Sequence, residues 1–256
     1  QHGFMKGRST ETNLVSITQT LCEAINCRQV DVIYTDFSKP FDRIDHSLLL
    51  SKLEHFGFSD SISKLLRSYL HDRYSFVYVR GFKSKSFKQE TGVPQGSILG
   101  PLLFNIFIDD VSDVLDVSYL LFADDLKIYS IINSTADSLK LQRNLDAVDN
   151  WCSENNFCLS SDKCEVMSFT RKSKTIYYDY HIRGVVVVKP DVIYDLGVFF
   201  DPKLSFNYHV NQIVDSAYKT LSFVIRSCRE FSDPNTLKVL FTTYVRSKLE
   251  YASLVW

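Results

Sequence analysis

The chain has 256 residues, which is long enough for one large domain or two, each with a buried core. Apolar residues make up 45% and charged residues 23%, values typical of a globular protein. No apolar run approaches the roughly 18 residues that a membrane helix needs, so we expect no membrane span. The net charge of −1 neither favours nor excludes a nucleic-acid partner, because basic residues gathered in a cleft can coexist with a neutral total.

The chain begins with a polar segment that lacks an initiator Met, and no signal peptide or other targeting signal is visible. We therefore expect a fragment of a longer protein. The six cysteines form no CxxC pair and no Cys/His cluster with zinc-site spacing, which favours reduced thiols in an intracellular protein. Local basic groups at 80–85 and 171–174 are each explained by a solvated face.

Helical and alternating apolar spacings occupy most of the first hundred residues. A loop rich in Gly and Pro, Gly92–Pro101, follows them and opens a strongly apolar helix over 102–108. The same patterns predict helices over 10–27 and 45–56, a strand over 31–37, a helix capped by Asp60 that carries Ile62 to Tyr69, and a hairpin over 74–90 that turns at Gly81.

The second half of the chain alternates strands with one long helix and then becomes entirely helical. Ser134 to Asp137 has the form of a capping box and starts the long helix, which carries Leu141 to Trp151. Asp233-Pro234 has the form of an N-cap followed by Pro at the first helical position. The predicted strands are 119–122, 126–130, 164–169, 175–182, 185–188 and 192–200, and the final helices are 208–229 and one from 233 onward. We expect a domain boundary near residue 204, with units 1–204 and 205–256.

The most informative feature is a pair of adjacent aspartates, Asp124 and Asp125, at the end of the apolar run 118–122. Adjacent carboxylates at the tip of a buried strand are costly, because repulsion and desolvation both oppose their charge. Asp36 ends a second apolar run, 31–35. Two strands that bring these aspartates together would form an oxygen-ligand site for Mg²⁺, which indicates two-metal phosphoryl or nucleotidyl transfer.

Each of these features alone has a plain structural explanation. Asp36 can simply end a surface strand, an Asp-Asp pair is common in turns, and Gly92–Pro101 can be an ordinary connection between strand and helix. All three in a fixed order, each at the end of an apolar segment, are hard to explain by packing alone.

Three segments in succession resemble motifs of reverse transcriptases. They are Asp36–Asp42, Gly92–Phe104 and Phe122–Asp125. This version is similar to non-LTR retrotransposons of the LINE type, nearest to the jockey-like elements of insects. Further likenesses cover nearly the whole chain: a fingers motif at 1–10, the fourth palm motif at 161–169, the primer-grip region at 195–201 and the start of the thumb at 231–256.

The resemblance implies an α+β fold, a right-hand polymerase with a palm and partial fingers (an antiparallel sheet with helices) followed by the start of a helical thumb. It implies an RNA-directed DNA polymerase that adds deoxynucleoside triphosphates to a DNA primer on template RNA, at target DNA. Its cofactors would be two Mg²⁺ ions, with Mn²⁺ as the alternative. It also implies a longer polyprotein with an endonuclease domain, located in cytoplasmic ribonucleoprotein and the nucleus.

The resemblance also assigns roles to individual residues. Asp36 and Asp124 would bind both metal ions and Asp125 would support the site, while Lys163 would lie near the leaving pyrophosphate. Phe41 would be the aromatic gate that excludes a ribose 2′-OH. The remaining nucleotide- and template-binding positions would be Phe37, Gln95, Gly96 and Arg8.

Position 40 departs from the family pattern, because it is Pro where the family usually has Ala. Polymerases of this kind hold the triphosphate with backbone N–H groups in this segment, and Pro40 has none. It also biases Lys39 away from helical geometry. We therefore hypothesise weak nucleotide binding. A smaller departure is Ser161, where the family often has Asn.

Two rival interpretations remain open. One is a catalytically impaired remnant that still binds RNA or hybrid duplex, which Pro40 favours and the three aspartates oppose. The other is a different Mg²⁺ palm enzyme such as a nucleotide cyclase, against which the loop at 92–101 and the helices after residue 204 both count, since a cyclase needs no template grip.

Overall fold

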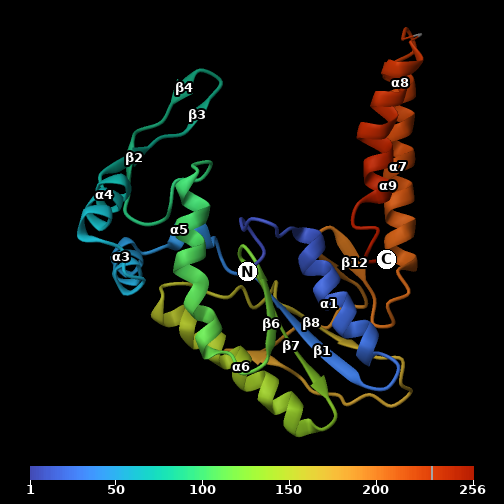
Figure 1. The fold of residues 1–256 in the computed structure, drawn as a ribbon, viewed down its shortest axis with the longest axis horizontal. Coiled ribbons are helices and arrows are strands. Elements are labelled where there is room, and N and C mark those ends of the chain that lie inside the picture. Colours follow the sequence, from blue (N-terminus) through green and yellow to red (C-terminus); the bar gives the residue numbers. More distant parts are fainter. Residues whose placement is uncertain (232) are drawn as a thin grey trace.

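A computed structural model describes residues 1–231 and 233–256. Its centre is a four-stranded antiparallel sheet in the order β6-β7-β1-β8 (Figure 1). The strands are β1 (Gln29–Thr35), β6 (Ser118–Phe122), β7 (Asp125–Ile132) and β8 (Glu165–Phe169).

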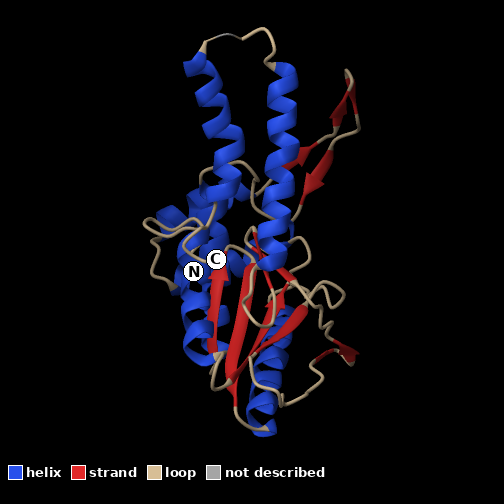
Figure 2. Ribbon diagram, turned by 90° about the vertical axis from the view of Figure 1, so that its right-hand side faces the viewer, coloured by secondary structure: helices blue, strands red, loops and turns tan. Residues whose placement is uncertain are grey.

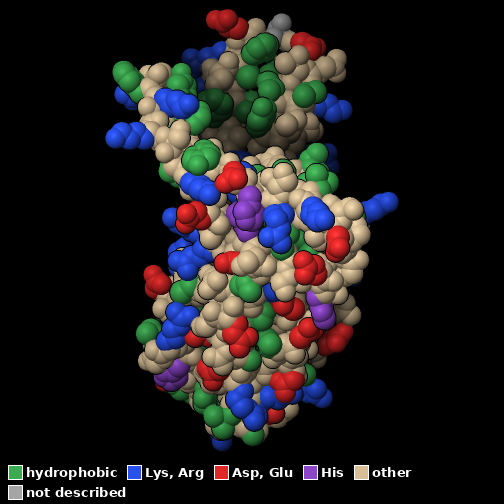
Figure 3. Space-filling view, turned by 90° about the vertical axis from the view of Figure 1, so that its left-hand side faces the viewer, with side chains coloured by type: hydrophobic (Ala, Val, Ile, Leu, Met, Phe, Trp, Pro, Cys, Tyr) green, Lys and Arg blue, Asp and Glu red, His purple; other side chains and the backbone are tan. Residues whose placement is uncertain are grey.

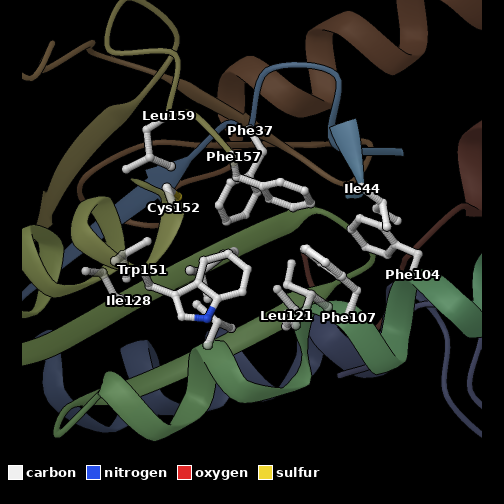
Figure 4. Close-up of a cluster of buried hydrophobic side chains, with 14 of the residues drawn as sticks. Phe37, Ile44, Phe104, Phe107, Leu121, Ile128, Trp151, Cys152, Phe157 and Leu159 are labelled. Carbon is white, nitrogen blue, oxygen red and sulfur yellow. The ribbon is translucent and has the colours of Figure 1, made fainter. Parts of the chain in front are cut away.

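Both faces of this sheet are covered, which explains why β1 reads as a nearly continuous apolar run. Side chains alternate between the faces, so Ile33 points into one cluster while Val32 points into the other. The first cluster lies against α5 (Leu99–Ile108) and α6 (Thr135–Glu154), where Phe107, Trp151 and their neighbours pack together (Figure 4). The second cluster lies against α1 (Thr10–Ala24) and the C-terminal residues.

A helical subdomain with a projecting hairpin lies between the first two strands of the palm in sequence. Its helices are α2 (Pro40–Arg43), α3 (His46–His55) and α4 (Asp60–Leu70). The hairpin consists of β2 (Arg73–Ser75), β3 (Tyr78–Val79), β4 (Phe82–Lys83) and β5 (Phe87–Gln89). A 3₁₀ helix, η1 (Asp109–Val114), follows α5.

The last part of the chain forms two small hairpins and then a pair of helical arms. The hairpins are β9 (His181–Ile182) with β10 (Val185–Val186), and β11 (Ile193–Asp195) with β12 (Val198–Phe200). The helices are α7 (Asn207–Ser227), α8 (Pro234–Leu240), the π-helix η2 (Phe241–Arg246) and α9 (Ser247–Glu250). Figure 1 shows both arms rising from the palm on the same side as the projecting hairpin, with a gap between the arms and the hairpin in this view.

Most of the predicted elements are present, with shifted ends. The helix at 60 begins at Asp60 itself, so the N-cap residue is Ser59 and the predicted cap at Asp60 is wrong. The predicted strand 175–182 is reduced to its last two residues, and 192–200 is two strands around a turn at Leu196–Gly197. No helix in the described ranges is long and apolar enough to cross a membrane.

Candidate active site

Antiparallel pairing brings the three aspartates to one end of the sheet. Thr35 at the end of β1 pairs with Leu126 of β7, so Asp36 comes beside Asp125. Asp124 lies in the two-residue turn that joins β6 to β7, where Ala123 has a left-handed φ of 52°. Strand register thus brings Asp36 to the adjacent pair Asp124 and Asp125, from which it is far apart in the chain.

The N-terminal segment fixes this turn, which the sequence patterns did not reveal. The Gln1 side chain accepts a hydrogen bond from the Ala123 N–H (2.9 Å) and donates one to the Ala123 carbonyl (3.2 Å). His2 N–H donates to the Leu121 carbonyl at 2.7 Å. Gly3 packs so closely that a Cβ there would lie 2.3 Å from the Ala123 nitrogen. No local signal predicts contacts between residues more than a hundred positions apart.

The carboxylates are held in an environment that disfavours their charge. Asp125 reaches solvent, but the protein around its carboxyl group displaces much of its hydration. This desolvation, then the charges of Asp124 and Asp195, raise the pKa of Asp125 to about 6. Burial and the charge of Asp36 also raise the pKa of Asp124. The Asp36 Oδ2 atom is buried without a hydrogen-bond partner, and its nearest cation is Lys163 Nζ at 3.5 Å.

The three aspartates offer carboxylate oxygens of the kind that bind divalent metal ions. Among residues 1–231 and 233–256, no three acidic, histidine or cysteine side chains form a ready-made metal-binding group. However, three carboxylates meet here, two with raised pKa values and one with an orphaned buried oxygen. Since a hard divalent cation would offset this repulsion and would complete the oxygen's bonding, the donor set fits such an ion.

A pocket of about 330 Å³ lies beside the carboxylates. One wall carries Asp36, Asp125 and Lys163, and the opposite wall is the β11–β12 turn at Leu196–Gly197. This turn is fixed by Tyr251, whose hydroxyl donates to the Leu196 carbonyl at 2.8 Å. The φ of Gly197 is +94°, and a Cβ at this position would approach the Tyr251 ring to 2.6 Å, so the position requires Gly. The pocket therefore lies between β7 and the β11–β12 turn that Tyr251 fixes.

A buried ion pair behind this pocket was also missed by the sequence patterns. Lys127 of β7 donates to Asp195 of β11 (2.5 Å) and to the Asn13 side chain of α1 (2.7 Å). The two charged side chains are only 1% and 4% exposed. The sequence did contain one indication of this ion pair, a lysine between apolar residues of a strand, Leu126-Lys127-Ile128. A buried charge is tolerated there only with a partner. The pair ties β7 to the β11–β12 hairpin.

The loop Gly92–Pro101 and the segment after Asp36 pack against each other. Gly92 lies on the backbone of Asp42, which a Cβ would approach to 2.8 Å. Gln95 Nε2 donates to an Asp42 carboxyl oxygen at 2.7 Å. Phe41 stacks on Phe104 with ring centroids 4.1 Å apart, and it is partly buried. The segment that carries Phe41, the predicted gate residue, therefore packs directly against the loop Gly92–Pro101 and the helix that follows it.

The other predicted site residues differ in how exposed their side chains are. Phe37 is buried at 4% exposure against Trp151 and Phe157, so a side-chain contact with nucleotide is excluded and the position offers only its backbone. Arg8 is exposed, and its guanidinium approaches His2 Nε2 at 3.4 Å. Gly96 has a φ of +79°.

Pro40 is the first residue of α2, and its ring is buried. Lys39 before it adopts φ 50° and ψ 54°, so it is outside the right-handed helical region as predicted, but it takes the left-handed conformation rather than the extended one that proline usually favours in the preceding residue. The segment that follows Asp36 therefore turns without an N–H at position 40.

The raised pKa of Asp125 predicts a specific pH dependence of stability. An acid whose pKa of about 6 in the folded protein exceeds its ordinary value of 3.8 opposes folding above pH 6, and the opposition fades as the pH falls towards 4. Asp125→Asn is therefore expected to raise the free energy of unfolding at pH 7.5 and to change it less at pH 5. Urea unfolding without divalent cations measures both values. The surface variant Asp191→Asn is the control, and an equal gain at both pH values would contradict the account.

An antiparallel sheet with three carboxylates at one end, flanked by a helical and hairpin subdomain, is the palm of a template-copying polymerase. The family model described as "Reverse transcriptase (RNA-dependent DNA polymerase)" matches residues 1–215, so the chain belongs to the reverse transcriptase family. This confirms the family and the α+β fold predicted from the sequence.

Curated relatives that match over most of the chain belong to non-LTR retrotransposons, as predicted. The chain is 29% identical over 230 residues to the RNA-directed DNA polymerase from mobile element jockey of Drosophila melanogaster, covering 86% of the chain and 25% of that protein. It is 28% identical to the probable RNA-directed DNA polymerase from transposon BS of Drosophila melanogaster, covering 86% of the chain and 26% of that protein. The chain thus spans about a quarter of the length of these relatives.

Solved structures with the same fold include telomerases. Apo telomerase from Candida tropicalis, truncated from its C-terminal domain, matches with a TM-score of 0.54 and 14% identity over 77% of the chain and 39% of that protein. The Candida tropicalis telomerase in complex with a TWJ fragment of telomeric RNA matches with a TM-score of 0.51 and 11% identity, over 95% of the chain and 41% of that protein. At these identities the likeness shows the fold alone.

Proposed function

We propose that the chain is the catalytic part of an RNA-directed DNA polymerase of a non-LTR retrotransposon, which adds deoxynucleotides to a primer 3′-hydroxyl on an RNA template. The observation that carries the proposal is the β1–β7 register, which brings Asp36 beside the adjacent pair Asp124 and Asp125, with Asp36 and Asp125 lining a pocket. The test is extension of a DNA primer on an RNA template. Extension supports the proposal, and its absence from a folded protein that binds the primer–template opposes it.

Asp36 and Asp124, supported by Asp125, would hold two Mg²⁺ ions, or Mn²⁺ in their place. Such ions lower the pKa of a bound hydroxyl and offset the charge of a triphosphate. Lys163 would supply a further cation. Its side chain is 66% exposed and its Nζ lies 3.5 Å from Asp36 Oδ2, so it is free to move to a leaving pyrophosphate and to donate a proton there.

On the nucleotide side, Gln95 and Gly96 would shape the pocket around the template base and the incoming nucleotide. The hydrogen bond from Gln95 to Asp42 supports this, because it fixes the loop against the segment that follows Asp36. Arg8 would reach the triphosphate from the fingers, and its exposure leaves its guanidinium available.

Phe41 would lie under the sugar and exclude a ribose 2′-OH. Phe41→Val is therefore expected to raise ribonucleotide use relative to deoxynucleotide use by about ten- to a hundredfold, a typical value for reshaping one pocket contact. Competing incorporation of one ribo- and one deoxynucleotide measures the ratio. Phe56→Val, which truncates an exposed ring of the helical subdomain, is the control. An unchanged ratio in a folded Phe41→Val protein would remove Phe41 from this role.

Pro40 lacks the N–H with which this segment would hold a triphosphate. Pro40→Ala restores that donor at the first position of α2, where alanine fits the helix. One charge-assisted hydrogen bond of roughly 1.5–3 kcal/mol predicts a gain of about ten- to a hundredfold in kcat/KM for the nucleotide. Single-nucleotide incorporation measures the gain, with Pro190→Ala as the control. Equal kinetic constants for parent and Pro40→Ala would refute the hypothesis.

The second candidate is a remnant that binds RNA or hybrid duplex without catalysis, and Pro40 is the observation that favours it. Extension that begins only in Pro40→Ala would identify a damaged nucleotide site on a sound fold. RNA binding without extension by either protein would favour the remnant.

The wider setting also belongs to the proposal. The relatives are about four times longer than this chain, which supports a larger polyprotein that includes an endonuclease domain and acts on target DNA in the nucleus. The helical arms from residue 205 onward would be the start of the thumb, and residues 1–204 the partial fingers and palm.

A further inference from the structure

Asp42, the last residue of the segment Asp36–Asp42, holds the side chain of Gln95. It is an exposed residue of α2, next to Phe41, and its Oδ1 atom accepts a hydrogen bond from Gln95 Nε2 at 2.7 Å. A carboxylate accepts hydrogen bonds, and a glutamine amide donates them only through its nitrogen. This contact therefore fixes which way the Gln95 amide faces. Its Nε2 end is held by Asp42, and its Oε1 end is left for another partner.

Backbone contacts also join the two segments, independently of the Asp42 side chain. The Val93 N–H donates to the Phe41 carbonyl at 3.0 Å. The Thr91 hydroxyl donates to the Asp42 carbonyl at 2.8 Å, and a Cβ at Gly92 would lie 2.8 Å from the Asp42 Cα. The carboxylate can therefore be removed without separating the loop from α2. What it adds to these contacts is the orientation of the Gln95 amide.

The loop that carries Gln95 lies on the side of the palm from which the arms and the projecting hairpin extend. The chain enters α5 from this loop, at the upper end of the helix in Figure 1, and both projections extend on that side (Figures 1 and 2). Gln95 is itself exposed. Its Oε1 atom is therefore available to a bound substrate.

The charges of this region are mixed in sign. On the face that carries α3 and α4, red acidic and blue basic side chains are interspersed (Figure 3). Opposite charges that alternate over a surface largely cancel at a distance, and salt screens the remainder. The loss of one charge at Asp42 therefore changes the long-range field little, so a large effect of its removal would report its local contact with Gln95.

We propose that Asp42 is a positioning residue for nucleotide binding and that it acts through Gln95. An exposed glutamine samples several rotamers, and fixing one of them when a ligand binds costs conformational entropy. The hydrogen bond to Asp42 fixes the amide beforehand, with Oε1 free to accept a hydrogen bond from the incoming nucleotide. This inference rests on the proposed function, which assigns Gln95 to the nucleotide side of the site.

The test measures nucleotide binding without catalysis. A primer that ends without a 3′-hydroxyl is annealed to an RNA template that carries fluorescent 2-aminopurine next to the coding base. The complementary deoxynucleoside triphosphate is then titrated into the complex with the full chain in Mg²⁺. Asp42→Ala and Gln95→Ala are each expected to raise Kd about tenfold, the effect of losing one charge-assisted hydrogen bond. The double variant is expected to bind no more weakly than Gln95→Ala, because Asp42 acts only through Gln95.

Exchanging the donor and the acceptor gives a second test, which a purely structural role cannot imitate. Gln95→Glu sets two carboxylates against each other and is expected to weaken nucleotide binding at least as much as Gln95→Ala. Asp42→Asn/Gln95→Glu restores an amide donor opposite a carboxylate, so it is expected to bind about tenfold more tightly than Gln95→Glu alone. Asp42→Asn by itself keeps an acceptor oxygen and is expected to lose less than Asp42→Ala.

A matched control comes from α6. Gln142 Nε2 donates to Asp146 Oδ1 at 2.8 Å, so Asp146→Ala removes the same kind of exposed contact with the same change in charge. It is expected to leave Kd unchanged. The whole series is repeated with Pro40→Ala added, where the restored N–H is expected to tighten nucleotide binding and to keep the weaker Kd values measurable.

Losses that add up in the double variant, or no gain from the exchange, would overturn the inference. Extension of a hydroxyl-terminated primer by the parent would then leave the proposed function standing. Coupled effects of Asp42 and Gln95 on nucleotide binding, in a chain that never extends a primer, would leave Asp42 in this role while the proposed function fails. No nucleotide binding, with or without Pro40→Ala, would overturn both.

Discussion

Asp124→Asn is expected to reduce single-nucleotide incorporation by about 10³-fold or more, because it removes a charged oxygen ligand from the site proposed to hold the metal ions. The asparagine fits the same turn, since asparagine tolerates the local conformations of turns as well as aspartate does. Rapid-quench primer extension on an RNA template measures the loss.

The same variant is expected to fold normally and to bind primer–template as the parent does. It removes one of the charges that repel one another at this end of the sheet, so its free energy of unfolding is expected to equal or exceed that of the parent. Asp113→Asn, a carboxylate of η1 outside the site, is the control. Incorporation by Asp124→Asn at more than a tenth of the parent rate would contradict the assigned role.

Lys127→Met is expected to lower the free energy of unfolding by about 3–5 kcal/mol. The variant leaves Asp195, which is only 4% exposed, as an uncompensated buried charge between β7 and β11. Chemical denaturation followed by circular dichroism measures the effect.

The double variant Lys127→Met/Asp195→Leu is the decisive companion. Replacing both partners of a buried pair with apolar residues is often neutral or stabilising, so it is expected to recover most of the lost stability. Lys140→Met, which breaks an exposed pair with Asp116, is expected to change stability little. If the double variant is no more stable than Lys127→Met, the penalty has another source than the unpaired Asp195.

The clustering of the three aspartates was predictable because its signals are local. Apolar runs end at Asp36 and at Asp124, and antiparallel pairing of two such strands is sufficient to bring the carboxylates together. The turn of the β3–β4 hairpin was also predicted correctly at Gly81. Arg80 and Gly81 both adopt positive φ, as a two-residue connection between twisted strands requires.

The features that sequence patterns missed depend on distant residues. Gln1 and Gly3 fix the Asp124 turn across more than a hundred positions, and no periodicity encodes that contact. Lys127 gave a partial signal as a charge within an apolar strand, but its partners Asn13 and Asp195 come from other elements.

The predicted strand at 175–182 shows how a side chain can replace a strand partner. Ile176, Tyr178 and Tyr180 alternate as a strand would, and Tyr180 is fully buried with its hydroxyl bonded to Asp31. However, the backbone N–H and carbonyl of Ile176 are bonded to the side chain of Gln29, at 2.8 and 2.9 Å. Alternation alone cannot distinguish these two ways of satisfying a backbone.

The most direct test of the central claim is incorporation of one nucleotide at a time opposite a defined RNA base, by the parent and by Asp36→Asn. The account predicts that the parent adds the complementary deoxynucleotide in Mg²⁺ and rejects the other three, and that Asp36→Asn adds none while still binding the primer–template. Addition that ignores the template base, or that persists in Asp36→Asn, would contradict the claim that these carboxylates carry out RNA-directed DNA synthesis.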